Sequence, residues 1–147
     1  MYQIWQIKFF DFKNMKGEKL IMAGKIEVII KNHKFKVRLN DSKTSRKILG
    51  ILPITSYLNT WGNEIYFSVP MKAKLENGIE TLDIGAVAFW PPGSALCIFF
   101  GKTPASAGEK PQAASPVTVV GHVEDKKSLL ALKEVKSGEK IEVRIAK

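Results

Sequence analysis

The chain has 147 residues, of which 45% are hydrophobic, and its formal net charge is +9. This length and composition suit one domain with a buried core and exclude wholesale disorder. No apolar run approaches the roughly 20 residues that a membrane-spanning helix needs. Residues 1–12 lack the long apolar middle and the small-residue cleavage site of a secretory signal. We therefore expect a cytoplasmic protein without a membrane partner.

The positive charge lies at the two ends of the chain. Residues 48–124 contain four basic and six acidic side chains, so the basic excess falls outside this segment. Lys34, Lys36 and Arg38 alternate with apolar residues, which is typical of the solvent-facing side of a strand. A nucleic-acid-binding surface usually interleaves basic side chains with aromatic platforms. We therefore expect no specific nucleic-acid partner.

The residues that most often carry metal binding or catalysis are scarce. The single cysteine, Cys97, lies in an apolar run and is expected to be a buried, inert thiol. His33 and His122 lie far apart in the sequence with no cysteine or acidic cluster beside them, so no metal site is expected. No nucleophile elbow, phosphate-binding loop or paired-cysteine motif is present, so no cofactor is expected and any catalytic residue stays unknown.

The first 23 residues differ from the rest of the chain. They show no clean periodicity and contain Met15 and Met22, which are alternative starts. We interpret residues 1–23 as an N-terminal appendage and residues 24–147 as the folded domain. The appendage could be a loose arm, an added edge strand or the result of an upstream start codon.

The first half of the domain combines strands with one short helix. Two runs at 25–31 and 34–39 predict a hairpin with its turn at 32–33, and the second run alternates strictly between polar and apolar residues. The segment 41–49 begins with helix-capping residues and predicts a short helix. A strand is expected at 64–69.

The second half contains the most apolar segments. Two nearly all-apolar strands are predicted at 86–90 and 95–100, on either side of a Pro-Pro-Gly turn, and such strands are covered on both faces. A long loop is expected at 101–116. The remaining elements are a strand at 117–123, a helix at 128–135 and a strand at 140–146. This order predicts a mainly β fold, with the sheet closed into a barrel and two short helices covering its ends.

Several segments, taken in order, resemble the cyclophilins. Residues 85–90 resemble the Gly-led apolar strand of that family, and Gly93-Ser94 followed by Ile-Phe-Phe at 98–100 resembles its Gly-Ser-Gln-Phe-Phe strand. Val-Val-Gly-His-Val at 119–123 resembles the strand that follows. The resemblance implies a cyclophilin-like β-barrel.

A closer resemblance is to the small prokaryotic cyclophilin-like proteins of unknown function. It is carried by the strings Trp-Gly-Asn-Glu-Ile-Tyr-Phe at 61–67 and Phe-Trp-Pro-Pro-Gly at 89–93, together with Ile-Phe-Phe-Gly-Lys-Thr-Pro at 98–104. It covers roughly residues 25–147.

The resemblance also indicates what this chain lacks. Cyclophilins isomerise X-Pro bonds with an apolar proline pocket and an Arg that hydrogen-bonds near the rotating amide. That Arg should fall near Ser68, but no Arg occurs between Arg46 and Arg144. The Trp and His that complete the pocket should fall within 102–117, which contains neither. Loss of a preorganised donor costs orders of magnitude in rate, so efficient isomerase activity is not expected.

The candidate site combines aromatic side chains with one carboxylate. Phe100 and Tyr66 are favoured because of where the resemblance places them, although aromatic residues here could simply fill the barrel. Glu64 lies next to Trp61 and Tyr66 in an apolar neighbourhood, where it either makes a structural pair or faces a ligand, and burial would raise its pKa. The candidate ligand-binding residues are Glu64, Tyr66, Trp90, Phe100, Lys102, Thr103 and Ser115.

The function that follows is binding. We expect a module that takes a small molecule or a proline-containing peptide and lacks the catalytic Arg. The alternatives are a weak peptidyl-prolyl cis-trans isomerase and a protein-interaction subunit that uses strand edges or residues 1–23. The sequence leaves the ligand and the oligomeric state open.

Overall fold

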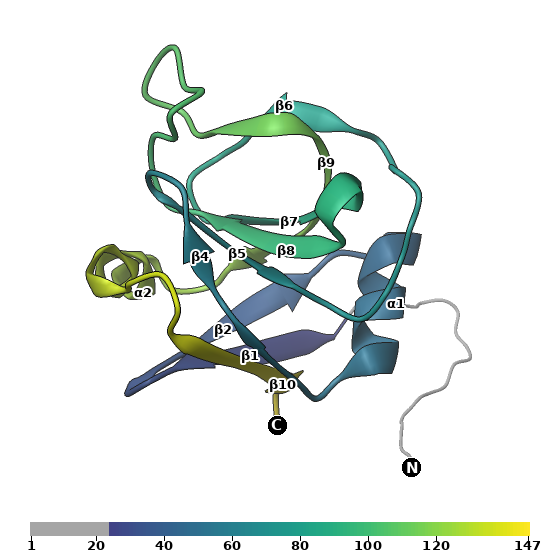
Figure 1. Ribbon diagram of the computed structural model, residues 1–147. Helices are drawn as coiled ribbons and strands as arrows, with labels where there is room; N and C mark the ends of the chain where they lie inside the picture. The colour runs from purple at the N-terminus through teal and green to yellow at the C-terminus, as the bar shows by residue number, and fades with distance from the viewer. Residues whose placement is uncertain (1–23) are drawn as a thin grey trace.

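Ten strands and two short α-helices make up the part of the chain that the structure, a computed structural model, describes (Figure 1). That part is residues 24–147, so the interpretation of residues 1–23 as an appendage lies outside it. The strands are β1 (Lys25–Ile30), β2 (His33–Leu39), β3 (Ile54–Tyr57), β4 (Asn59–Thr60), β5 (Glu64–Ser68), β6 (Ile79–Thr81), β7 (Ala86–Trp90), β8 (Ala95–Phe99), β9 (Gln112–Val123) and β10 (Lys140–Ile145). The helices are α1 (Lys43–Ile51) and α2 (Lys126–Ala131), and 3-10 turns cover Pro91–Gly93 and Leu132–Glu134. Across residues 24–147, no helix is long and apolar enough to cross a membrane.

Neighbouring strands pair antiparallel in the order β3-β10-β1-β2-β9-β7-β8-β5-β4, and β6 pairs with β9 beside this path. The expected closed barrel is not found, because no backbone ladder within residues 24–147 joins β3 to β4 or β5. These end strands are joined through Leu58, whose backbone N–H donates to Glu139 O at 3.0 Å and whose carbonyl accepts from Gly138 N. The backbone of Leu58 is thus committed to the segment before β10, and pairing with β5 starts only at Asn59.

The predicted hairpin and first helix are confirmed with small changes of boundary. β1 and β2 pair with Ile30 opposite His33, so the turn is at 31–32 and His33 belongs to β2. The polar residues of β2 are exposed and its apolar residues are buried, as the alternation predicts. α1 begins after Ser42, whose Oγ accepts a hydrogen bond from Ser45 N at 3.1 Å.

The long loop predicted at 101–116 is shorter in the structure. β9 begins at Gln112, five residues before the predicted strand, because its first half pairs with β6: Thr81 lies opposite Gln112 and Ile79 opposite Val117. β6 has three residues, all exposed, and is too short for a sequence periodicity to predict it. Figure 1 shows β6 and the adjoining part of β9 on one side of β7 and β8, with β1, β2 and β10 on the other.

Strands β5, β7 and β8 separate two clusters of buried side chains. Because side chains alternate between the faces of a strand, the larger cluster takes Ile65, Phe67, Val87, Phe89, Leu96 and Ile98 from these strands, together with residues of β1, β2, β10 and both helices. The smaller cluster takes the opposite face and consists of Leu82, Ala86, Ala88, Cys97, Phe99, Ala113 and Val117. The core is therefore two-sided, and the smaller cluster lies beneath β6 and the first half of β9.

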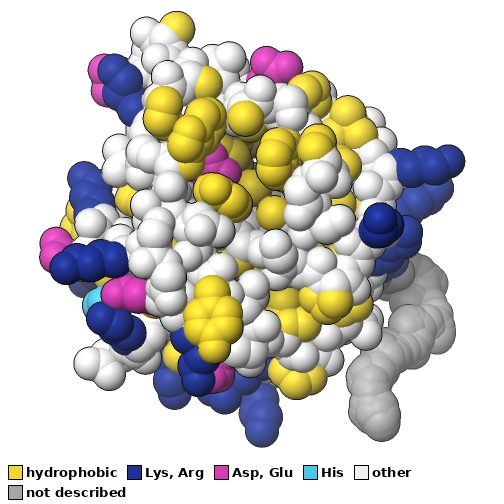
Figure 2. All heavy atoms as spheres, in the orientation of Figure 1, with side chains coloured by type: hydrophobic (Ala, Val, Ile, Leu, Met, Phe, Trp, Pro, Cys, Tyr) yellow, Lys and Arg dark blue, Asp and Glu magenta, His cyan; other side chains and the backbone are white. Residues whose placement is uncertain are grey.

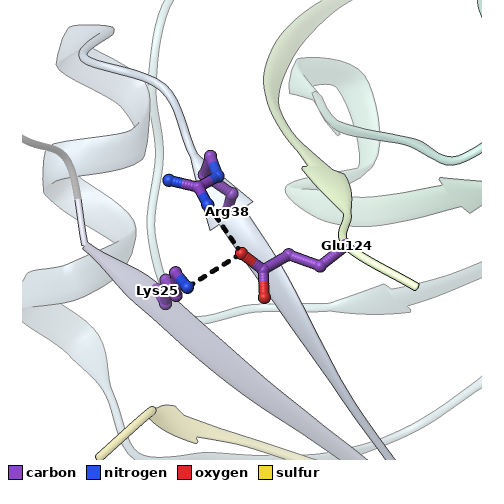
Figure 3. Close-up of polar contacts among 3 residues, drawn as sticks. All are labelled: Lys25, Arg38 and Glu124. Carbon is purple, nitrogen blue, oxygen red and sulfur yellow. Dashed lines mark hydrogen bonds and ion pairs between the residues drawn. The ribbon is translucent and has the colours of Figure 1, made fainter.

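One carboxylate ties the end of β9 to the β1–β2 hairpin. Glu124 Oε2 lies 2.9 Å from Lys25 Nζ and 3.0 Å from Arg38 Nη2, as Figure 3 shows. The hydrogen bond from Lys25 lowers the pKa of Glu124, and the positive charges of Lys25 and Arg38 act in the same direction. These groups are largely exposed, so the pairs fix local geometry more than they add stability.

Candidate functional site

A cavity of about 240 Å³ opens on the face of the sheet that carries the smaller cluster. We call it the tryptophan cavity; it is lined by Trp61, Glu64, Tyr66, Trp90, Cys97, Ala113, Ala114 and Val117. Figure 2 shows a hollow in this face, with hydrophobic side chains gathered around it and an acidic side chain inside. The lining comes from β5, β7, β8, β9 and the turn before β5.

Strand alternation and pairing explain how these residues meet. Glu64 and Tyr66 are two residues apart on β5 and therefore share one face. Tyr66 lies opposite Cys97 of β8, and Cys97 lies opposite Ala88 of β7. Cys97 and Ala88, in the middle of this line of neighbouring residues across the three strands, have small side chains that cannot fill the gap beneath β9. The hollow is thus produced by small residues between large aromatic ones.

Trp90 is held in place from two sides. Its indole Nε1 donates a hydrogen bond to Ser115 Oγ of β9 at 2.7 Å. Its ring also lies against Gly93: a Cβ atom at position 93 would come within 2.6 Å of Trp90 Cζ3. Only glycine accommodates the ring there, which gives the Trp-Pro-Pro-Gly string a physical reason. The wall that Trp90 forms is therefore fixed before any ligand arrives.

A tight turn positions Trp61 and Glu64. Trp61 N donates to Glu64 O at 2.8 Å, and Glu64 N donates to Trp61 O at 3.2 Å. Gly62 within the turn has φ +60°, and a Cβ there would lie 2.8 Å from Pro104 Cδ. Asn63 N donates to Lys102 O at 2.8 Å, which docks the turn on the segment after β8. The Trp-Gly-Asn-Glu string therefore encodes one edge of the cavity.

Among residues 24–147, Glu64 is the only carboxyl group that lines the cavity, and it is 5% exposed. Burial raises the pKa of Glu64 to about 7, and a hydrogen bond with the Cys97 thiol acts in the opposite direction. Burial, with the nearby Glu64 carboxylate, raises the pKa of Cys97 well above its usual value, so this thiol is not activated. The direction expected for Glu64 and the burial expected for Cys97 are both confirmed.

The seven residues proposed from the sequence have different places in the structure. Glu64, Tyr66 and Trp90 line the cavity, and Ser115 supports Trp90 from behind. Thr103 is buried and organises the loop after β8, because its Oγ1 donates to Gln112 O at 2.6 Å and its backbone N–H donates to Ser106 Oγ at 2.9 Å.

Phe100 and Lys102 are not among the residues that line the cavity. Phe100 is 6% exposed and belongs to the larger cluster, whereas Phe99 lies on the cavity's face of β8. The side chain of Lys102 is exposed, and its contribution to the turn before β5 is its backbone carbonyl.

Five of the lining residues are not among the candidates that the sequence predicts. Trp61 enters the prediction only as a neighbour of Glu64, and Cys97 only as a core thiol. Period-two spacing could have placed Cys97 and Phe99 on one face of β8. No local signal identifies Ala113, Ala114 or Val117, because they reach the cavity through the pairing of β9 with β7 and β6.

Comparisons with known proteins agree with this architecture. The family model described as Cyclophilin-like matches residues 24–144. The chain is also similar to the hypothetical protein AF2241 from Archaeoglobus fulgidus, whose solution structure is known: the two are 35% identical, the match covers 89% of this chain and 100% of the other, and the TM-score is 0.74. No curated protein matches the chain. The chain therefore belongs to the cyclophilin-like family, which confirms the resemblance seen in the sequence.

Proposed function

We propose that this protein is a binding module that takes a small molecule, or one side chain of a peptide, into the tryptophan cavity. The observation that most supports this proposal is a hollow whose described residues form aromatic walls around a single buried carboxyl group, that of Glu64. Binding sites for small ligands have this composition: mostly apolar walls and a few placed polar groups. None of the described residues that line the cavity is basic, so the Arg that cyclophilins use has no counterpart among them.

Two features favour binding over a purely structural role. The walls are fixed by the Trp90–Ser115 hydrogen bond and the turn before β5. The protein would therefore lose little conformational entropy when a ligand enters. A carboxyl group inside an apolar cavity costs free energy whenever it ionises without a partner. Perturbed groups of this kind concentrate at functional sites.

An amide NMR titration tests the proposal. The labelled protein would be titrated with a panel of small molecules and with a short proline-containing peptide. We expect shifts to cluster around Tyr66, Trp90 and Cys97. Exchange cross-peaks between the cis and trans forms of the peptide would add isomerase activity to binding.

A pair of tyrosine variants provides the control. Tyr66→Ala removes a wall of the cavity, whereas Tyr57→Ala removes an exposed tyrosine of β3. Binding should weaken at least about tenfold in the first variant, which corresponds to roughly 1.4 kcal/mol, and should persist in the second. Unchanged binding in Tyr66→Ala, with shifts elsewhere on the surface, would contradict the proposal.

A further inference from the structure

In the part of the chain that the structure describes, the tryptophan cavity combines three aromatic side chains with one carboxyl group and no basic partner. Trp61, Tyr66 and Trp90 line it, and Glu64 lies among them. The Cys97 thiol, which also lines the cavity, is neutral because burial raises its pKa, and the Tyr66 hydroxyl brings no positive charge. From β9 the cavity receives only Ala113, Ala114 and Val117, none of which is charged. An ionised Glu64 therefore meets no positive charge from residues 24–147 in the cavity.

The faces of aromatic rings attract cations, most strongly when the cation has lost its water, and Trp is the best of the three aromatic residues for this interaction. A carboxylate beside the rings adds direct charge attraction in a low-dielectric site. We propose that the tryptophan cavity recognises a methylated ammonium group, which the aromatic side chains surround and Glu64 neutralises. This inference rests on the proposed binding function and names its ligand class.

The size of the cavity agrees with a compact headgroup. About 240 Å³ corresponds to roughly eight volumes of liquid water, which accommodates a trimethylammonium group. Apolar methyl groups on the cation also suit the cavity's Ala and Val side chains. The headgroup can belong to a free small amine or to a methylated lysine side chain of a peptide, since both present the same chemistry.

Titration of Glu64 gives the interaction a pH dependence. With a pKa of about 7 in the empty cavity, Glu64 is largely neutral at acidic pH and largely ionised at pH 8. A cation binds the ionised form better, so binding should release a proton below pH 7. Affinity for an ammonium ligand should rise with pH and level off above about 8, whereas affinity for a neutral ligand should not rise.

The decisive experiment compares choline with its neutral isostere 3,3-dimethyl-1-butanol by calorimetry at pH 8. The two probes have nearly the same shape and differ in charge. We expect choline to bind at least about tenfold more tightly, the discrimination that roughly 1.4 kcal/mol provides. Glu64→Gln should abolish most of this preference, and Glu80→Gln, which changes an exposed glutamate of β6, should leave it intact.

The outcomes separate this inference from the proposed function. If the isostere binds as tightly as choline, the ammonium inference is wrong and the binding function stands. If no probe binds, and the ligand panel and peptide also fail, both are wrong. Repeating the wild-type titration from pH 5.5 to 8 provides a test that needs no variant: affinity for choline that falls with rising pH would overturn the inference. A trimethyl-lysine peptide that binds more tightly than choline would support it and identify a protein-borne headgroup.

Discussion

The two faces of β5, β7 and β8 are filled differently. The face toward the larger cluster carries Phe67, Phe89 and Ile98, each at most 1% exposed. The opposite face carries Ala86, Ala88 and Cys97 in its middle, with Tyr66 and Trp90 beside them. Both faces exclude water from most of their area, yet a cavity forms on only one of them.

This difference shows that side-chain volume, and not only the polarity of Glu64, separates core from candidate site here. Large side chains that interdigitate leave no room for a ligand, since protein interiors pack as densely as organic crystals. Small residues between rigid aromatic ones leave a hollow, provided that neighbouring groups stop the aromatic rings from collapsing into it. Ser115 and Gly93 provide this support for Trp90.

Truncation of one side chain on each face gives the largest expected effect. Phe89→Ala should lower the free energy of unfolding by about 3–5 kcal/mol, the range for fully buried aromatic residues, because Phe89 is 0% exposed. Trp90→Ala should cost clearly less stability, because this side chain is only partly buried, but should abolish ligand binding. Urea denaturation followed by circular dichroism measures the free energy of unfolding of both variants. Equal costs would mean that the two faces are one continuous core.

The second prediction concerns the pH dependence of stability. The pKa of Glu64 is about 7 in the folded state and near 4.5 when unfolded, so the folded state binds the proton more tightly. The stabilisation from the protonated carboxyl is complete below pH 4.5 and is lost as pH rises through 7. Relative to wild type, Glu64→Gln should gain stability between pH 4.5 and 8, by on the order of 3 kcal/mol at most.

Denaturation midpoints of the two proteins at several pH values would show this gain. Glu80→Gln, at an exposed position, is the matched control and should follow the wild-type curve. A constant offset between Glu64→Gln and wild type at all pH values would mean that Glu64 does not titrate in this range.

The third prediction concerns a variant in which the face that carries the cavity is filled with apolar side chains, like the face toward the larger cluster. Cys97→Leu places a larger apolar side chain in the hollow, where it should fill space rather than clash. The free energy of unfolding should change by less than about 1.5 kcal/mol, while binding of any cavity ligand should weaken at least about tenfold. Denaturation and the NMR titration measure the two effects. A large loss of stability would show that the space around Cys97 is already filled.

The smallest expected effect tests how Trp90 is supported. Ser115→Ala removes the acceptor of the indole N–H and should cost about 1 kcal/mol. Ser56→Ala removes an exposed hydroxyl that donates to Ser68 O and should cost less. The two variants differ in whether the lost hydrogen bond holds a wall of the cavity. If both leave ligand affinity unchanged, Trp90 is held by Gly93 and its packing alone.

Much of the fold could be predicted from local patterns. Strict alternation predicted β2, and the apolar runs predicted β7 within its observed bounds and β8 to within one residue. The pattern failed for β6 and the first half of β9, because β6 has only three residues and neither segment has a clear strand periodicity before the two pair with each other. The prediction of a closed barrel was also wrong, because the hydrogen bonds of Leu58, which lies between the two end strands, depend on residues eighty positions away.

The sequence by itself determined the mainly β class, the family, and the three candidate residues that line the cavity, Glu64, Tyr66 and Trp90. These follow from periodicity and short motifs, which are properties of neighbouring residues. Only the tertiary structure decided that Cys97 and Trp61 join them and that Phe100 belongs to the larger cluster instead. The physical reason is that a cavity forms where the surrounding side chains are too small to fill the space between them. Which side chains surround that space depends on strand pairing, which brings them together from distant positions in the sequence.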